Sequence, residues 1–256
     1  MSINISSLSY EVDNKKILNE ISLKIELGEV LCVLGQNGSG KSTLVNLISG
    51  NLEATKGDIF FDKVDLKKIS IEDRAFSRSV MTQSQPIVFD FTVREIIEMG
   101  WLKRGNFIFS KDFKHVFNQV VDEASIGNLI EKKFNVLSGG EQKRVHLART
   151  LIQAWRPSNS NDPKYIFLDE PTANLDINYE KKVMEIVRKK ADEGIGILLI
   201  VHDINLACKY SDKIAVLKDG FLLGFGSPED TLTEEILSNS FDLPVKVIKK
   251  PLSFEY

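Results

Sequence analysis

The chain has 256 residues, of which 43% are hydrophobic and 27% charged, a composition typical of a globular protein. A chain of this length buries about three quarters of its unfolded surface, which is enough for one large domain with subdomains. The formal net charge is −3 and no block of basic residues occurs, which argues against a dedicated nucleic-acid binder. No apolar run reaches the length of about 18 residues that a membrane span requires.

Residues 1–27 are predicted to form antiparallel strands. Apolar and polar residues alternate from Ile21 to Leu27, the pattern of a strand with one buried face. Tyr10 stands just before the turn at residues 13–16, and the pattern alone favours a surface aromatic residue of a strand there. The two cysteines, Cys32 and Cys208, have no C-x-x-C neighbour, and both are predicted to be small buried side chains.

A glycine-rich segment, which we call the phosphate loop, follows the apolar run of residues 30–34. It fits G-x-x-x-x-G-K-[ST] and consists of Gly35, Gln36, Asn37, Gly38, Ser39, Gly40, Lys41, Ser42 and Thr43. A helical pattern follows, and the N-terminus of such a helix attracts phosphate. Lys41 would reach the terminal phosphates and Ser42 would help to bind Mg²⁺. The strand and helix on either side favour a nucleotide site over a glycine-rich turn of another α/β protein.

Helical patterns replace the sheet between about residues 84 and 150. Thr92 and Glu95 form a capping box at the start of one helix. A second helix carries apolar residues at helical spacing: Phe113, Val116, Phe117, Val120 and Val121. Apolar runs at 165–168, 197–201 and 214–217 then predict buried strands, with a helix at about 178–190 between the first two. This strand–helix–strand order predicts a parallel sheet with an inserted helical lobe.

Two carboxylates, Asp169 and Glu170, follow the predicted strand 165–168 at the edge where ligands bind in open α/β sheets. Asp169 would bind Mg²⁺, and Glu170 would orient or deprotonate the attacking water. Pro171 keeps Glu170 out of helical geometry. A solvent-facing turn after a strand remains the alternative. His202 ends another predicted strand, where it would hydrogen-bond the γ-phosphate, unless it is a structural histidine.

A second unusual segment, the signature segment, is Leu137-Ser138-Gly139-Gly140-Glu141-Gln142. Ser138 and Glu141 fit a capping box, but the glycines between them cost about 1 kcal/mol each relative to alanine in a helix. Close approach of an anion to the helix N-terminus would explain them. Because the phosphate loop already supplies one such site, we infer that the phosphates are shared with another copy of the chain.

The order of these motifs is similar to that in the ATP-binding subunits of ABC transporters. The resemblance covers nearly the whole chain and implies an α/β fold with a P-loop NTPase (RecA-like) core, an antiparallel β subdomain and an inserted α-helical subdomain. It predicts one domain over residues 1–256, with the core and β subdomain at about 1–83 and 151–256 and the helical subdomain at about 84–150.

The resemblance also implies a mechanism. Two ATP molecules with Mg²⁺ would lie in a head-to-tail homodimer, each between a phosphate loop and the partner's signature segment. Catalytic roles go to Lys41, Gln83, Glu170 and His202, and Gln83 joins Ser42 and Asp169 as a Mg²⁺ ligand. Residues assigned to nucleotide binding outside the phosphate loop are Ser138, Gly139, Gly140, Glu141, Asp176 of the interface loop, and Tyr10. For Tyr10 the resemblance reverses the first interpretation and makes it the aromatic that stacks on adenine.

The implied partners are two membrane permease subunits and, indirectly, a substrate-binding protein, with the chain peripheral on the cytoplasmic face of the bacterial inner (plasma) membrane. Phe89, Phe91 and Trp101 would contact the permease or pack inside the lobe. The segment 202–207 resembles the corresponding segment in ATP-binding subunits of importers of iron chelates, haem and cobalamin. The loop that follows Trp155 resembles an insertion of the haemin subfamily. The resemblance thus implies the ATP-hydrolysing motor subunit of a bacterial importer, with haemin as the ligand; a siderophore or cobalamin importer, an exporter subunit and a soluble ABC-type ATPase remain alternatives.

Overall fold

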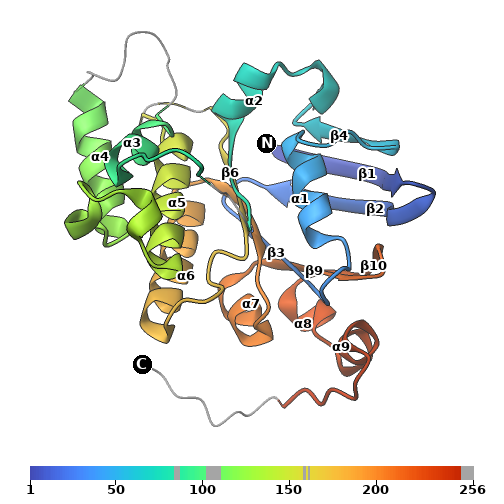
Figure 1. Ribbon diagram of the computed structural model, residues 1–256. Helices are drawn as coiled ribbons and strands as arrows, with labels where there is room; N and C mark the ends of the chain where they lie inside the picture. Colours follow the sequence, from blue (N-terminus) through green and yellow to red (C-terminus); the bar gives the residue numbers. More distant parts are fainter. Residues whose placement is uncertain (84–86, 102–110, 158–159, 161, 249–256) are drawn as a thin grey trace.

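The computed structural model describes residues 1–83, 87–101, 111–157, 160 and 162–248, arranged as two β-sheets with helices around them (Figure 1). The strands are β1 (Ser2–Val12), β2 (Lys15–Glu26), β3 (Val30–Gly35), β4 (Lys56–Phe61), β5 (Val64–Asp65), β6 (Arg78–Met81), β7 (Tyr165–Asp169), β8 (Gly196–Ile200), β9 (Lys213–Lys218) and β10 (Phe221–Gly226). The α-helices are α1 (Lys41–Ser49), α2 (Ile71–Ser77), α3 (Val93–Glu98), α4 (Lys111–Glu123), α5 (Gly139–Ala154), α6 (Ile177–Asp192), α7 (Ile204–Tyr210), α8 (Pro228–Thr231) and α9 (Glu234–Phe241). Short 3-10 turns lie at Leu66–Lys68, Gly127–Leu129 and Phe134–Val136.

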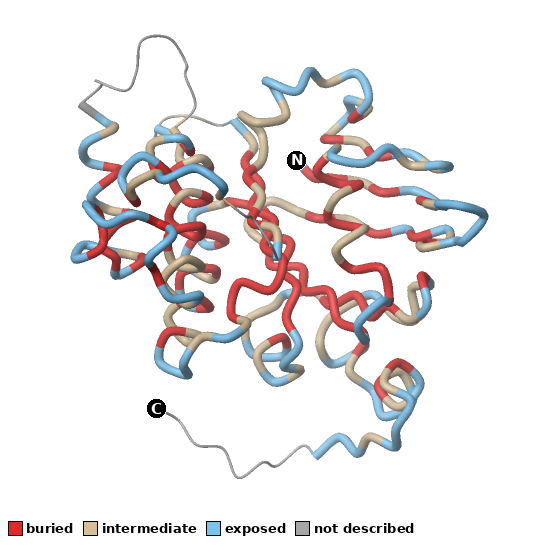
Figure 2. The backbone as a smooth tube through the Cα atoms, viewed as in Figure 1, coloured by how far each residue is buried: buried red, intermediate tan, exposed pale blue. Residues whose placement is uncertain are grey.

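The larger sheet has the strand order β10-β9-β3-β8-β7-β6. Its strands from β9 to β6 are parallel, and β10 pairs with β9 in the antiparallel direction. Every residue of β3, β7 and β8 is buried, as the red centre of Figure 2 shows. Strands that are covered on both faces have continuous apolar sequences, so the predicted parallel sheet is confirmed.

Alternate residues of each central strand enter two different cores. Val30 and Cys32 of β3 belong to the core that the sheet shares with helices α3 to α7, whereas Leu31 and Val33 belong to the core that it shares with α1 and the small sheet. The small sheet is antiparallel with the order β2-β1-β4-β5. Because β3 is held from both sides, the loop that follows it begins from a fixed point.

The lobe formed by α3, α4 and α5 begins with well-defined caps. Thr92 and Glu95 form the predicted capping box of α3, and Ser138 and Glu141 form that of α5. Helix α5 packs on α3 and α4 and also on β6 and β7 of the core. The residue limits proposed for the inserted lobe therefore stay a prediction.

Aromatic residues of the lobe differ in their surroundings. The ring of Trp101 lies 5.3 Å from that of Phe113 and 5.2 Å from that of Trp155, centroid to centroid. Phe91 is also packed against the core, whereas Phe89 is 71% exposed. Of the three residues considered for permease contact, Phe89 is the one whose side chain is available on the surface of this chain.

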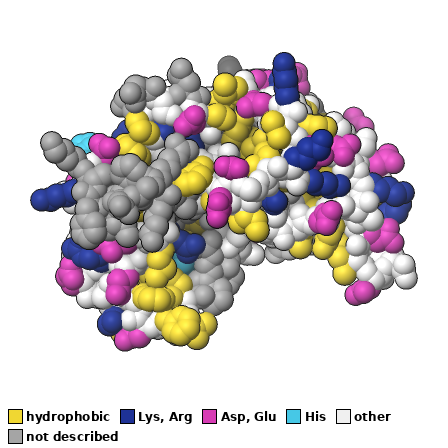
Figure 3. Space-filling model, turned by 90° about the horizontal axis from the view of Figure 1, so that it is seen from above, with side chains coloured by type: hydrophobic (Ala, Val, Ile, Leu, Met, Phe, Trp, Pro, Cys, Tyr) yellow, Lys and Arg dark blue, Asp and Glu magenta, His cyan; other side chains and the backbone are white. Residues whose placement is uncertain are grey.

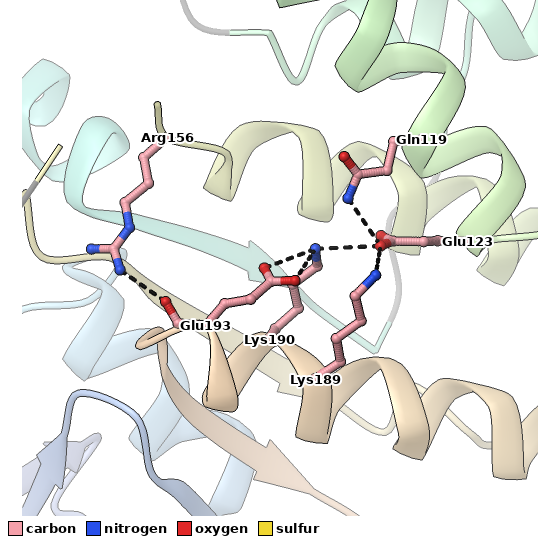
Figure 4. Close-up of polar contacts among 6 residues, drawn as sticks. All are labelled: Gln119, Glu123, Arg156, Lys189, Lys190 and Glu193. Atoms are coloured by element: carbon pink, nitrogen blue, oxygen red, sulfur yellow. Dashed lines mark hydrogen bonds and ion pairs between the residues drawn. The ribbon is translucent and has the colours of Figure 1, made fainter. Parts of the chain in front are cut away.

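A buried ion pair connects α4 of the lobe with α6 of the core (Figure 4). Glu123 Oε1 accepts hydrogen bonds from Lys189 at 2.8 Å, Lys190 at 3.4 Å and Gln119 at 3.1 Å. Lys190 also pairs with Glu193 at 3.1 Å, and both Lys190 and Glu123 are nearly buried. Burial acts to raise the pKa of Glu123, but the bond from Lys189 and the charge of Lys190 outweigh it and lower that pKa.

Replacement of Glu123 by Gln is expected to lower the free energy of unfolding at neutral pH by about 1–3 kcal/mol, the usual contribution of a hydrogen bond to a charged group. The folded pKa lies below the ordinary value of 4.5, so this stabilisation is full above that pH and declines as the pH falls through the folded pKa. Denaturant unfolding of both proteins from pH 7 to pH 3 should show the difference shrinking. Glu131→Gln, at a 78% exposed partner of Arg94, is the matched control and should change little. A difference that grows towards acid would contradict the assignment.

The outer surface mixes charges of both signs on the face shown in Figure 3, with hydrophobic side chains between them. In the part of the chain that the structure describes, no helix combines the length and the apolar character needed to cross a membrane. Cys32 is buried as predicted, but the prediction for Cys208 is wrong, because its side chain is exposed. Ala207 is the buried residue of the short helix α7, and Cys208 falls beside it on the solvent face.

Candidate nucleotide-binding and hydrolysis site

The phosphate loop joins the carboxyl end of β3 to the N-terminus of α1. Gly35 has φ +146° and Gly40 has φ +103°, a region that side chains with a Cβ rarely adopt. A Cβ at Gly35 would lie 2.2 Å from the carbonyl oxygen of Leu217, and one at Gly40 would lie 2.5 Å from Leu18 Cδ2. Both glycines are therefore needed to pass the loop between β9 and β2.

Lys41 is the first residue of α1 and is only 6% exposed. Its ammonium donates to the carbonyl oxygens of Gly35 at 2.8 Å and Gln36 at 2.9 Å. Burial lowers the pKa of Lys41, while the charges of Glu170 and Asp169 act in the opposite direction. The lysine is thus held over its own loop, with its positive charge facing the two carboxylates at the end of β7.

Asp169 is the last residue of β7 and is 3% exposed. Burial raises its pKa, and a hydrogen bond from the Ser42 hydroxyl acts against that shift. Its Oδ1 has no hydrogen-bond partner among the described residues. A buried carboxylate oxygen without a donor is costly, so this atom is suited to a cation.

Residues that follow three neighbouring strands meet at the carboxylate of Glu170. Its Oε2 accepts a hydrogen bond from Gln83 Nε2 at 2.8 Å, and its Oε1 lies 2.7 Å from His202 Nε2. Gln83 follows β6, Glu170 follows β7 and His202 follows β8. Parallel strands end at one edge of a sheet, which is why residues so distant in sequence meet here.

These side chains face a cavity of about 610 Å³. Its lining consists of Lys15, Ile17, Asn37, Gly38, Gly40, Lys41, Ser42, Thr43, Gln83, Glu170 and His202. Of these, Lys15 and Ile17 were not expected. They lie at the start of β2, and their only sequence signal is an apolar and a basic residue directly after a turn. Four other predicted site residues lie in the phosphate loop or at the end of β7 but do not line the cavity: Gly35, Gln36, Ser39 and Asp169.

Other predicted nucleotide-binding residues do not line this cavity. Tyr10 is half-buried, pairs with Leu18 and packs on the core of the small sheet, so its role in adenine stacking stays a prediction. The signature residues Ser138, Gly139, Gly140 and Glu141 form the start of α5, and Asp176 caps α6 by accepting from the Tyr179 N–H at 3.0 Å. Within one chain, none of these signature residues lines the cavity beside the phosphate loop.

Comparison with known families decides the identity of the fold. The family model described as ABC transporter matches residues 18–173, more than half of the chain. The chain belongs to the ABC transporter family. The matched range contains the phosphate loop, the signature segment and the carboxylates of β7, and the predicted α/β P-loop NTPase fold is confirmed.

Curated relatives match over nearly the entire chain. The "Hemin import ATP-binding protein HmuV" of Hydrogenovibrio crunogenus is 37% identical, covering 95% of this chain and 94% of the relative. The protein of the same name from Escherichia coli O157:H7 is 34% identical, covering 97% and 95%.

Solved structures of ABC proteins superpose closely. A dimeric ATP-binding cassette in a post-hydrolysis state, bound to ADP and Pi, gives a TM-score of 0.77 at 25% identity and covers 88% of this chain and 98% of its own. The cbiO1 protein of Clostridium perfringens, part of the ABC transporter complex cbiONQ, gives 0.74 at 28% identity and covers 93% and 92%. The chain is accordingly an ATPase of the ABC transporter type, which binds and hydrolyses ATP.

Proposed function

We propose that the chain is the motor subunit of a bacterial ABC importer for haemin. The observation that carries this proposal is that four relatives, each 32–37% identical over at least 92% of the chain, are all named as haemin import ATP-binding proteins. The ATPase site does not contact the transported ligand, so both the ligand and the direction of transport are proposed here from these relatives.

The residues around Asp169 are suited to Mg²⁺. The buried Oδ1 of Asp169, which has no donor in the described part of the chain, the hydroxyl of Ser42 beside this carboxylate and the amide oxygen of Gln83 are oxygen ligands of the kind that Mg²⁺ prefers. Bound Mg²⁺ would neutralise negative charge on the terminal phosphates of ATP. We propose Ser42, Asp169 and Gln83 as its ligands.

The remaining residues of the site would bind the phosphates and activate the attacking water. The backbone N–H groups of the phosphate loop and the N-terminus of α1 would bind the phosphates, and the ammonium of Lys41 would pair with them. Glu170, turned into the cavity by Gln83 and His202, would accept a proton from the attacking water. His202 would hydrogen-bond the γ-phosphate.

We propose that the site is completed by a second copy in a head-to-tail homodimer. Among the described residues the start of α5 is open: a Cβ at Gly139 would meet no atom within 4 Å, and one at Gly140 would meet only ordinary contacts. The glycines are thus not required by the packing of the single chain, which supports an approach from outside. Closure of the dimer would drive two permease subunits, and the chain would be peripheral on the cytoplasmic face of the inner membrane.

Reconstitution with the permease in liposomes tests the ligand. ATP hydrolysis is expected to rise when a haemin-loaded substrate-binding protein is added, compared with the same binding protein without haemin. Stimulation by a cobalamin- or siderophore-loaded binding protein, with none by the haemin-loaded one, would replace haemin as the cargo. Export of a substrate in the absence of any binding protein would overturn the importer assignment.

A further inference from the structure

The main chain of Glu170 adopts an unusual conformation. Its φ is +52°, in the left-handed region that is unfavourable for residues with a Cβ. The following residue, Pro171, further restricts its backbone. A residue held in such a state depends on its surroundings to keep it there, and such states cluster at active sites.

Two backbone hydrogen bonds hold the main chain of Glu170, one at its N–H and one at its carbonyl oxygen. The Glu170 N–H donates to the carbonyl oxygen of Ile200 on β8 at 3.1 Å. The Glu170 carbonyl oxygen accepts from the Ala173 N–H at 3.3 Å, a long bond within the following turn. The carbonyl therefore needs a further donor to be fixed firmly.

Lys143 supplies that donor from another element. It lies in the second turn of α5, and its Nζ donates to the Glu170 carbonyl oxygen at 2.8 Å. Burial lowers the pKa of Lys143, and the carboxylates of Glu170 and Asp169 oppose this shift. The Lys143 side chain is not part of the cavity lining.

We propose that Lys143 is a positioning residue for ATP hydrolysis, which holds the main chain of Glu170 so that its carboxylate stays aimed at the attacking water. The proposal rests on the proposed role of Glu170. Because Lys143 belongs to the helix that begins with the signature segment, it also links the orientation of the Glu170 carboxylate to the position of α5.

Steady-state kinetics of Lys143→Met and Lys143→Arg provide the first test. The methionine variant should lose on the order of 10- to 100-fold in kcat, the effect expected from slight misplacement of a catalytic group, with KM for ATP unchanged. The arginine variant retains a cationic donor and should recover most of the rate. Lys213→Met removes a comparably buried lysine paired with Glu29 at 3.0 Å and should keep the wild-type rate. Equal kcat for Lys143→Met and wild type, or no recovery with arginine, would overturn the proposal.

ATP-dependent dimerisation in the Glu170→Gln background separates positioning from mere support of α5. If Lys143 acts through Glu170, the double variant Lys143→Met/Glu170→Gln should form the ATP-bound dimer as well as Glu170→Gln alone. Loss of the dimer in the double variant alone would show that Lys143 supports the nucleotide contact of α5 instead, and would overturn the positioning role. Failure of Glu170→Gln alone to dimerise would count against the proposed shared site, independently of Lys143.

Discussion

Replacement of Glu170 by Gln is expected to reduce ATP hydrolysis by about 10²- to 10⁴-fold, the range that a general base contributes. Glutamine has nearly the same shape and still hydrogen-bonds Gln83 and His202, but its amide does not accept the proton of the attacking water. The phosphate loop and Lys41 are untouched by the change, so ATP should bind as tightly as before.

Because ATP is bound but not consumed, the variant should accumulate as a dimer. Phosphate release measures the loss of turnover, and size-exclusion chromatography with and without ATP measures the dimer. Glu185→Gln, at an exposed position of α6, is the matched control and should behave as wild type. Turnover of Glu170→Gln near the wild-type rate would remove Glu170 from its catalytic role.

The central architecture could be predicted because it follows from short-range patterns. Continuous apolar runs identified the buried strands of the large sheet, and capping residues such as Thr92 and Ser138 marked where helices begin. The meeting of Glu170 with His202 also follows from the sequence, since both stand at the ends of parallel strands.

Residues whose roles depend on how separate elements pack were not predictable in the same way. Lys15 and Ile17 enter the cavity because β2 runs past the phosphate loop, and a basic and an apolar residue after a turn are too common a pattern to indicate that. Lys143 reaches Glu170 from a different helix, with no motif beyond the helix itself. The interior position predicted for Cys208 rests on residue type alone, whereas the short helix α7 buries Ala207 and leaves Cys208 exposed.

A substitution at the signature segment should have an effect as large as that at Glu170, although Ser138 does not line the cavity of its own chain. Arginine at Ser138 would fill the open space at the start of α5 with a long side chain. It would also remove the hydroxyl that accepts the Glu141 N–H. We expect a loss of about 10²-fold or more in ATP hydrolysis, comparable with removal of a donor that stabilises transition-state charge. ATP binding to the phosphate loop of the single chain should remain.

The loss of the helix cap must be separated from the loss of the shared site. Ser70→Arg removes an equivalent N-cap at α2, which costs about 1 kcal/mol of stability, and should leave hydrolysis nearly unchanged. Equal melting temperatures for the two variants, with hydrolysis lost only in Ser138→Arg, would assign the effect to nucleotide contact. Loss of hydrolysis in both variants would indicate a general effect of helix fraying.

Mixing two inactive variants tests directly whether each site is built from two chains. Ser138→Arg retains an intact phosphate loop, and Lys41→Ala retains an intact signature segment. In a mixed dimer, one of the two sites combines the normal Lys41 of the first chain with the normal Ser138 of the second. Hydrolysis should therefore rise above that of either variant alone when the two are mixed, with a maximum near equal amounts. If each chain formed a complete site by itself, no mixture would exceed the more active of its components, and the open glycines at the start of α5 would need a different explanation.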